Sequence, residues 1–269
     1  MSGNLRLLTG TLARAKRDGR AALVTYHPAG FPTVDDGIAA ILATLDAGAD
    51  VVEVGLPHSD PVLDGPVIQT ADDIALRGGV RIADVLRTVR EVHAATGKPV
   101  LVMSYWNPVS RYGVERFARE LAEAGGAGCV LPDLPVPESA PWRRAAAEHD
   151  LATVFVVAPS STDAQLAETA AAGTGFVYAS ALMGVTGTRD SVDEAAAVLA
   201  GRLRAVTDLP VCVGMGVANA RQAAHVAGFA DGVIVGSALV GTLLDADDQT
   251  EGRIALTRLA GELAAGVRA

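Results

Sequence analysis

The feature that most constrains the fold of this 269-residue chain is a regular alternation of short apolar runs with helical segments. An amphipathic helix is predicted at Leu5–Arg17, and eight pairs of a strand and a helical segment follow it. Apolar runs of this kind are typical of parallel strands that are covered on both faces. The predicted strands are Ala21–Tyr26, Asp50–Val54, Pro99–Ser104, Gly128–Leu131, Ala152–Val157, Phe176–Ala179, Pro210–Val213 and Gly232–Val235.

This count predicts an α/β fold, a (β/α)8 TIM barrel with an extra N-terminal helix, in one domain spanning residues 1–269. An open doubly wound sheet is the competing fold, but no Gly-x-Gly-x-x-Gly follows the first predicted strand. No linker or low-complexity tract indicates a second domain.

The composition of the chain limits which partners it can bind and in which cellular compartment it is expected. The formal charge of −9 and the absence of a basic run argue against nucleic acid. The N-terminal segment lacks the apolar core of a signal peptide, and no apolar run reaches membrane-spanning length. Cys129 and Cys212 lie in apolar strands without metal-ligand spacing, which indicates buried thiols in a reducing compartment. We therefore expect a cytoplasmic protein.

One predicted strand contains a charged residue, Glu53, near its carboxyl end. A carboxylate in a buried strand is unfavourable unless it is used, and burial raises its pKa. The loop that follows, Leu56–Pro66, contains three prolines, which restrict its conformation, and two acids, Asp60 and Asp64. An ion pair or ordinary turn chemistry could explain each acid alone. Their combination at the carboxyl end of a barrel strand favours a proton-transferring carboxyl with a second carboxylate beside it.

Glycine-containing loops follow the sixth, seventh and eighth predicted strands. They are Gly184–Gly187, Gly214–Gly216 and the pair Gly236–Ser237, the last at the start of a helix. Glycine lets backbone N–H groups approach an anion, and the last two strands of a TIM barrel commonly bind phosphate. We therefore expect a phosphorylated small molecule as the substrate.

Missing residues exclude other chemistry. The two lysines, Lys16 and Lys98, lie in the first helix and at the entry of a strand, so a Schiff-base mechanism is not supported. His27 and His58 are predicted in loops at the catalytic mouth, but they lack a ligand motif, and no metal is predicted. No Gly-x-Ser-x-Gly is present. General acid–base catalysis by Glu53 with Asp64 remains.

Several motifs of the chain resemble the tryptophan synthase α subunit family. The longest is EVGLPHSDPVLDGPVIQ at Glu53–Gln69. The others are YHPAGFP (Tyr26–Pro32), YWNP (Tyr105–Pro108), LPDLP (Leu131–Pro135), GVTG (Gly184–Gly187), VGMGV (Val213–Val217) and VGSAL (Val235–Leu239). The resemblance implies a lyase that splits indole-3-glycerol phosphate into indole and glyceraldehyde 3-phosphate by a retro-aldol reaction.

The resemblance also implies roles for individual residues. Glu53 matches the proton shuttle, and Asp64 matches the carboxylate that accepts the indole N–H. The remaining matches are Tyr26, Tyr105 and Tyr178 for the indole pocket, Gly187, Gly216, Gly236 and Ser237 for phosphate, Thr186 and Asp133 for loop closure and its support, and Asp60 and Asn107 for the partner interface.

The family implies an α–β–β–α heterotetramer with a β subunit that carries pyridoxal phosphate, while the chain itself needs no cofactor. His27, His58 and Ala181–Leu182 depart from the family pattern near the mouth. Three alternatives stay open. They are a stand-alone lyase that releases free indole, a non-catalytic barrel that acts as an allosteric subunit, and an isomerase of a phosphorylated sugar.

Overall fold

The computed structural model describes residues 3–61, 63–180, 189–214 and 216–269. Its strands are all parallel and form one sheet in the order β5-β4-β3-β2-β1-β9-β8-β7-β6. The strands are β1 (Ala22–Pro28), β2 (Val51–Gly55), β3 (Val100–Met103), β4 (Gly128–Val130), β5 (Ala152–Val154), β6 (Val156–Val157), β7 (Val177–Ser180), β8 (Val211–Gly214) and β9 (Gly232–Val235).

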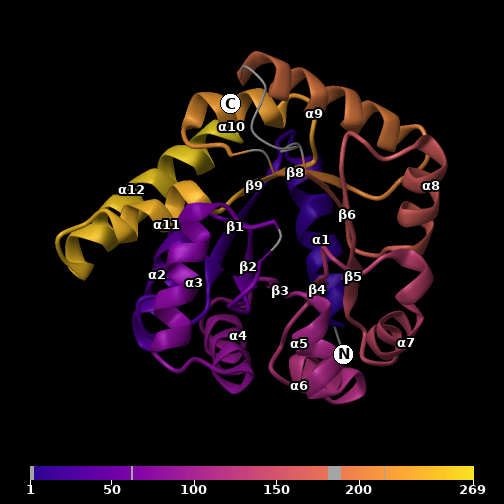
Figure 1. The fold of residues 1–269 in the computed structure, drawn as a ribbon. Coiled ribbons are helices and arrows are strands. Elements are labelled where there is room, and N and C mark those ends of the chain that lie inside the picture. The colour runs from indigo at the N-terminus through magenta and orange to yellow at the C-terminus, as the bar shows by residue number, and fades with distance from the viewer. Residues whose placement is uncertain (1–2, 62, 181–188, 215) are drawn as a thin grey trace.

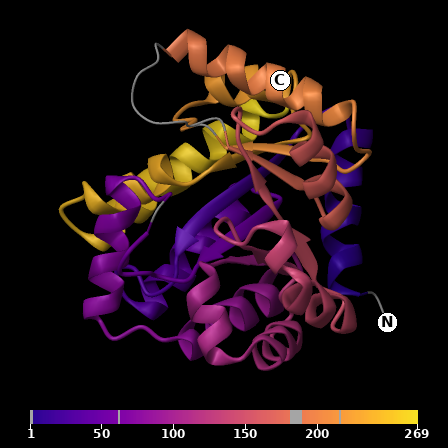
Figure 2. The same cartoon turned by 45° about the vertical axis from the view of Figure 1, so that its right-hand side comes forward.

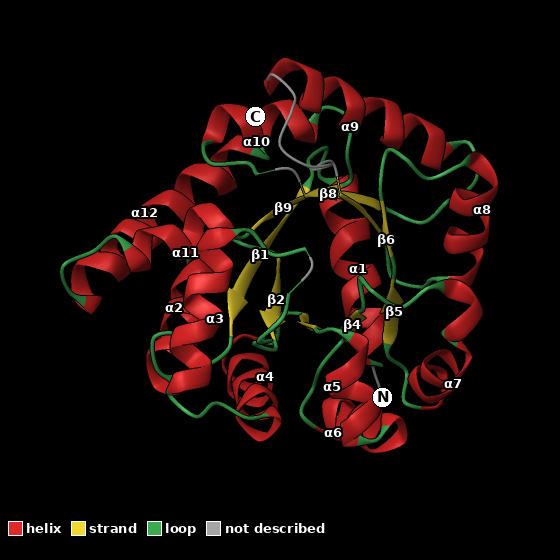
Figure 3. Cartoon of the chain, in the orientation of Figure 1, coloured by secondary structure: helices red, strands yellow, loops and turns green. Residues whose placement is uncertain are grey.

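The two edges of this sheet belong to one stretch of chain. β5 pairs with β4, β6 pairs with β7, and only Phe155 separates β5 from β6. The sheet therefore closes on itself as an eight-stranded barrel whose fifth strand is interrupted, and the predicted fold class is confirmed. Figure 3 shows the strands at the centre with the helices around them.

The surrounding helices are α2 (Val34–Asp46), α3 (Pro66–Arg77), α4 (Ile82–Thr96), α5 (Trp106–Tyr112), α6 (Val114–Glu123), α7 (Ala140–Glu148), α8 (Asp163–Ala172), α9 (Arg189–Arg204), α10 (Ala220–Ala227), α11 (Ser237–Leu244) and α12 (Gln249–Gly266), with a 3₁₀ turn at Val136–Glu138. In the described part of the chain, no helix is both long and apolar enough to cross a bilayer.

The extra N-terminal helix, α1 (Asn4–Arg17), packs against one end of the barrel interior (Figures 1 and 2). Its buried Leu8, Leu12 and Ala15 join a cluster with inward-facing strand residues such as Val24 of β1 and Leu101 of β3. Apolar side chains therefore fill the barrel interior at the amino-terminal ends of the strands. Any polar site inside the barrel is left to the carboxyl ends of the strands.

The structure contains one helix that the sequence analysis did not include, α5, whose Asn107 and Pro108 fall in the first turn, where proline is tolerated. The predicted helix start at Ser237 is confirmed, and α11 ends at Leu244 as a separate element before α12. Such short helices depend on tertiary packing and not on periodicity.

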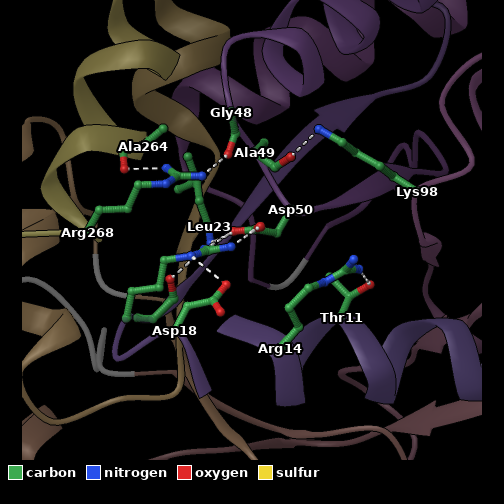
Figure 4. A network of polar contacts seen from close by, with 12 residues as sticks. Thr11, Arg14, Asp18, Leu23, Gly48, Ala49, Asp50, Lys98, Ala264 and Arg268 are labelled. Carbon is green, nitrogen blue, oxygen red and sulfur yellow. Dashed lines mark hydrogen bonds and ion pairs between the residues drawn. The ribbon is translucent and has the colours of Figure 1, made fainter. Parts of the chain in front are cut away.

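A group of ion pairs and hydrogen bonds secures the amino-terminal ends of the strands (Figure 4). Asp50, just before β2, accepts two hydrogen bonds from the Arg20 guanidinium at 2.7 and 2.8 Å and a third from the Leu23 N–H at 2.9 Å. Arg268, near the end of the chain, donates to the Gly48 carbonyl oxygen at 3.1 Å. Burial alone would raise the pKa of Asp50, but the Arg20 and Leu23 hydrogen bonds outweigh it and hold the pKa below its ordinary value.

We predict that Asp50→Asn lowers the free energy of unfolding by roughly 1–3 kcal/mol, because it leaves the half-buried Arg20 without its charged partner. The stabilisation from Asp50 is present above pH 3.8 and is lost as the pH falls through its lower folded-state pKa. Denaturant unfolding at pH 7 measures the effect. Asp18→Asn is the control, because the exposed Asp18 lies 3.9 Å from Arg20. Equal stability of the two variants would contradict the prediction.

Candidate functional site

A cavity of about 240 Å³ opens at the carboxyl ends of the strands. It is lined by residues from the barrel interior and from the loops after β2, β8 and β9. The lining includes seven of the residues predicted from sequence: Tyr26, Glu53, Asp64, Tyr178, Gly216, Gly236 and Ser237. Residues far apart in the chain therefore meet in one place, as expected for the mouth of a TIM barrel.

Glu53 lies on the floor of this cavity with a fully buried side chain. Neither carboxyl oxygen has a hydrogen-bond partner among the described residues. Burial removes water from the carboxylate and raises the pKa of Glu53 to about 8. At neutral pH Glu53 is therefore largely protonated and can act as a general acid, and its conjugate base can then take a proton back.

Two tyrosines, Tyr26 and Tyr178, line the cavity, and each hydroxyl group occupies space that is free only because a neighbouring residue is glycine. A Cβ atom at Gly55, at the end of β2, would lie 2.1 Å from the Tyr26 hydroxyl oxygen. A Cβ atom at Gly214, at the end of β8, would lie 2.5 Å from the Tyr178 hydroxyl oxygen. Burial, followed by nearby carboxylates, raises the pKa of both phenols well above 10. Both rings are neutral and offer flat, largely apolar faces to a ligand.

Asp64 lies in the loop between β2 and α3, and Tyr105 fixes it there. The Tyr105 hydroxyl donates to Asp64 Oδ2 at 2.8 Å and accepts from the Leu63 N–H at 3.1 Å. Burial raises the pKa of Asp64, and the Tyr105 hydrogen bond and the nearby His58 partly offset this rise. Tyr105 is not among the cavity-lining residues; it contacts the loop that carries Asp64.

Sequence reasoning missed a third carboxyl near the site, Asp72 on α3. Its side chain is 2% exposed, and burial together with the charge of Asp64 raises its pKa to about 7. A signal was available, because Ile68, Ala71, Asp72 and Ala75 form the buried stripe of α3 at helical spacing. The adjacent Asp73 is exposed and pairs with Arg77 instead.

The part of the cavity lined by Gly216, Gly236 and Ser237 has the features of an anion site. Gly216 has a φ of +69°, which favours glycine, and Gly236 directly precedes Ser237, the first residue of α11. The N–H groups of a helix start point outward and attract negative charge. The predicted Thr186 and Gly187 lie outside the described residues.

The other predicted residues lie around the mouth. The exposed carboxylate of Asp133 accepts hydrogen bonds from the Trp106 N–H at 2.8 and 3.1 Å, at the start of α5 and next to Tyr105. Asp60, which accepts a hydrogen bond from the Ser59 hydroxyl, and Asn107 are both exposed.

The prediction that His27 lies in a mouth loop is wrong. His27 is in β1, is buried, and faces α2 with Nε2 3.3 Å from the Thr44 hydroxyl oxygen, because alternate residues of a strand face opposite sides. Burial lowers the pKa of His27 to about 4. Within the described residues no three His, Cys, Asp or Glu side chains form a group that could hold a metal.

Neither described lysine reaches the cavity. Lys98 Nζ donates to the carbonyl oxygens of Leu45 and Ala49 before β2, at the amino-terminal end of the barrel, and Lys16 pairs with Asp231 at 3.1 Å. The cavity therefore combines a protonated acid, a positioned carboxylate, aromatic walls and an anion site. This arrangement suits proton transfer to an aromatic ring that bears a phosphorylated chain.

Comparisons with known proteins show the family of the chain. The family model described as tryptophan synthase alpha chain matches residues 12–268. The tryptophan synthase alpha chain of Streptomyces avermitilis is 75% identical over 263 residues, which are 98% of this chain and 95% of the relative. That of Streptomyces coelicolor is 72% identical over 268 residues, covering 100% and 99%.

Solved structures show the same fold. A crystal structure of tryptophan synthase from M. tuberculosis superposes with a TM-score of 0.89 at 48% identity, covering 97% of this chain and 98% of that chain. The tryptophan synthase subunit alpha from Legionella pneumophila gives a TM-score of 0.88 at 31% identity, also covering 97% and 98%.

We predict that Glu53→Gln stabilises the folded protein at high pH, by roughly 2–4 kcal/mol at pH 9. The folded-state pKa of Glu53 is raised from 4.5 to about 8, so the destabilisation from its charge develops between these values and is complete above pH 8. Denaturant unfolding at pH 5 and pH 9 measures the difference, which should be small at pH 5. The exposed Glu168→Gln is the control, and an equal gain for Glu53→Gln at both pH values would rule out this explanation.

Proposed function

Because the chain belongs to the tryptophan synthase alpha chain family, we propose that Glu53 and Asp64 carry out the family's reaction in a single domain of residues 1–269. The chain is a carbon–carbon lyase that cleaves indole-3-glycerol phosphate to indole and glyceraldehyde 3-phosphate, the α reaction of tryptophan biosynthesis. The observation that best supports these roles is the fully buried carboxyl of Glu53, which has no hydrogen-bond partner among the described residues and lines the same cavity as Asp64.

The proposed cleavage begins with proton transfer from Glu53 to the indole ring carbon that bears the glycerol phosphate chain. The ring becomes an indolenine with positive charge at nitrogen, and Asp64 stabilises it by accepting the N–H hydrogen bond. The hydroxyl on the adjacent chain carbon then loses its proton to the Glu53 carboxylate. The carbon–carbon bond breaks, its electron pair returns to the ring as indole, and the chain leaves as an aldehyde. Glu53 is protonated again at the end of the cycle.

We assign the indole pocket to the part of the cavity lined by Tyr26 and Tyr178, and we propose that Tyr105 supports this pocket from outside the cavity lining by holding Asp64. We assign the phosphate to Gly216, Gly236 and Ser237 at the start of α11, with Gly187 from the loop after β7. Thr186 and Asp133 are proposed to assist loop closure, Asp133 by holding the start of α5 beside Tyr105.

We propose that the chain assembles with a tryptophan synthase β subunit as an α–β–β–α tetramer. The exposed Asp60 and Asn107, with Leu63 at 53% exposure, are the proposed contact residues at the mouth. Pyridoxal phosphate is expected only on the partner, and the acid–base chemistry described above requires no cofactor in this chain. The free, buried thiols of Cys129 and Cys212 support a cytoplasmic location.

We predict that Glu53→Gln and Asp64→Asn each lower kcat for cleavage of indole-3-glycerol phosphate by ~10²-fold or more, because each removes a group that acts in the transition state. Steady-state release of glyceraldehyde 3-phosphate measures the loss. Asp60→Asn is the matched control, since it removes a carboxylate from the same loop but outside the cavity. Turnover within a few-fold of wild type in both variants would disprove the assigned roles.

We predict that adding a tryptophan synthase β subunit raises the rate of indole formation and that Asp60→Ala with Asn107→Ala reduces this gain. Loss of these contacts should weaken binding of the β subunit, while the rate of indole formation by the isolated chain should change less. Titration of the β subunit, with size-exclusion chromatography of the mixture, measures both effects. Full activity without the partner and no complex on the column would favour the stand-alone lyase.

A further inference from the structure

Asp72 is a buried carboxyl that the proposed reaction does not use. It lies on α3 with 2% exposure, and its Oδ1 atom has no hydrogen-bond partner among the described residues. Its Oδ2 atom accepts one long hydrogen bond, from the His58 N–H at 3.5 Å. A buried carboxyl with so few partners destabilises a fold, so its position calls for an explanation beyond packing.

The residue that Asp72 contacts is connected to Asp64 by a short series of contacts. The His58 ring lies against the Tyr105 ring, with centroids 4.9 Å apart and planes 32° apart. The Tyr105 hydroxyl in turn donates to Asp64 Oδ2 at 2.8 Å. The first part of the loop between β2 and α3 is therefore tied to Asp72, and its last part is tied to the tyrosine that the His58 ring contacts.

We propose that Asp72 is a positioning residue that anchors the His58 backbone and, through the Tyr105 ring, fixes Asp64 for the cleavage of the substrate. This role rests on the function proposed above. Asp72 does not line the cavity, so it acts on the reaction through its neighbours and not by contact with the substrate.

The strength of the hydrogen bond between Asp72 and the His58 N–H depends on whether Asp72 is ionised. Among the described residues, the Asp64 carboxylate and the His58 backbone N–H on the loop and the Tyr26 hydroxyl on β1 interact with Asp72, while α11, which also packs on α3, has no ionisable side chain. Burial, then the charge of Asp64, raises the pKa of Asp72 to about 7. Because an ionised carboxylate is the stronger acceptor, the hold on His58 strengthens as the pH rises through this value.

Three variants test the proposal by steady-state kinetics between pH 6 and pH 9. Asp72→Ala removes the acceptor and should lower kcat by about tenfold or more with a smaller change in KM, since misplacing Asp64 affects mainly the transition state. Asp72→Asn keeps an acceptor oxygen but not the charge, so it should retain more activity and lose one ionisation near pH 7 from its profile. Asp73→Asn is the control, because the adjacent, exposed Asp73 bonds only to Arg77 among the described residues.

The backbone amide of His58 gives a second measurement that does not depend on catalysis. In ¹H–¹⁵N NMR spectra of the ligand-free protein, its resonance should titrate near pH 7 in wild type and in Asp73→Asn, and this titration should be lost in Asp72→Asn. An unchanged titration in Asp72→Asn would trace the shift to another group and overturn the anchor, as would wild-type kcat and KM in Asp72→Ala. Absence of cleavage by wild type would instead disprove the proposed function, while the His58 titration would still decide the anchor.

Discussion

Glu53 carries a carboxyl group in a strand that is covered on both faces, and the barrel removes its water without giving it a hydrogen-bond partner in the described part of the chain. This desolvation raises the pKa of Glu53 to about 8 and keeps a proton on an acid that would be ionised in water. The other cavity-lining residues, including Asp64, Tyr26 and Tyr178, surround the space next to the Glu53 carboxyl. Tyr26 and Tyr178 reach the cavity because Gly55 and Gly214 leave room for their hydroxyl groups.

The two ends of the barrel shift the pKa of a carboxyl group in opposite directions. At the amino-terminal end, Arg20 and the Leu23 N–H satisfy Asp50, whose pKa falls and whose charge stabilises the fold. At the carboxyl end, no described residue forms a hydrogen bond with the Glu53 carboxyl, so its charge destabilises the fold but its proton is available for chemistry. Stability and catalysis are thus separated along the barrel axis, as is general for this fold.

The loop between β2 and α3 connects Glu53, on the barrel floor, to Asp64, the carboxylate proposed to act on the indole nitrogen. Three prolines limit its conformations, Tyr105 holds it near its carboxyl end, and Asp72 contacts its beginning. Asp64 is therefore positioned by residues from α3 and from the start of α5, and not by its own loop alone. Such support keeps a loop carboxylate within the narrow geometry that transition-state stabilisation requires.

The sequence by itself determined the barrel and the extra helix, because apolar periodicity is a local pattern, and the charge inside an apolar run singled out Glu53 as a candidate. Its motifs also predicted Asp64 and the late glycines as site residues, and Asp64, Gly216 and Gly236 line the cavity with Glu53. Only the tertiary structure decided which way each side chain faces and what it meets: His27 turned out to face α2, Tyr105 to hold Asp64, and Asp72 to be buried beside the site. Burial and partners arise from contacts between residues distant in the chain, such as His58 with Tyr105, and these contacts set the pKa values on which the chemistry depends.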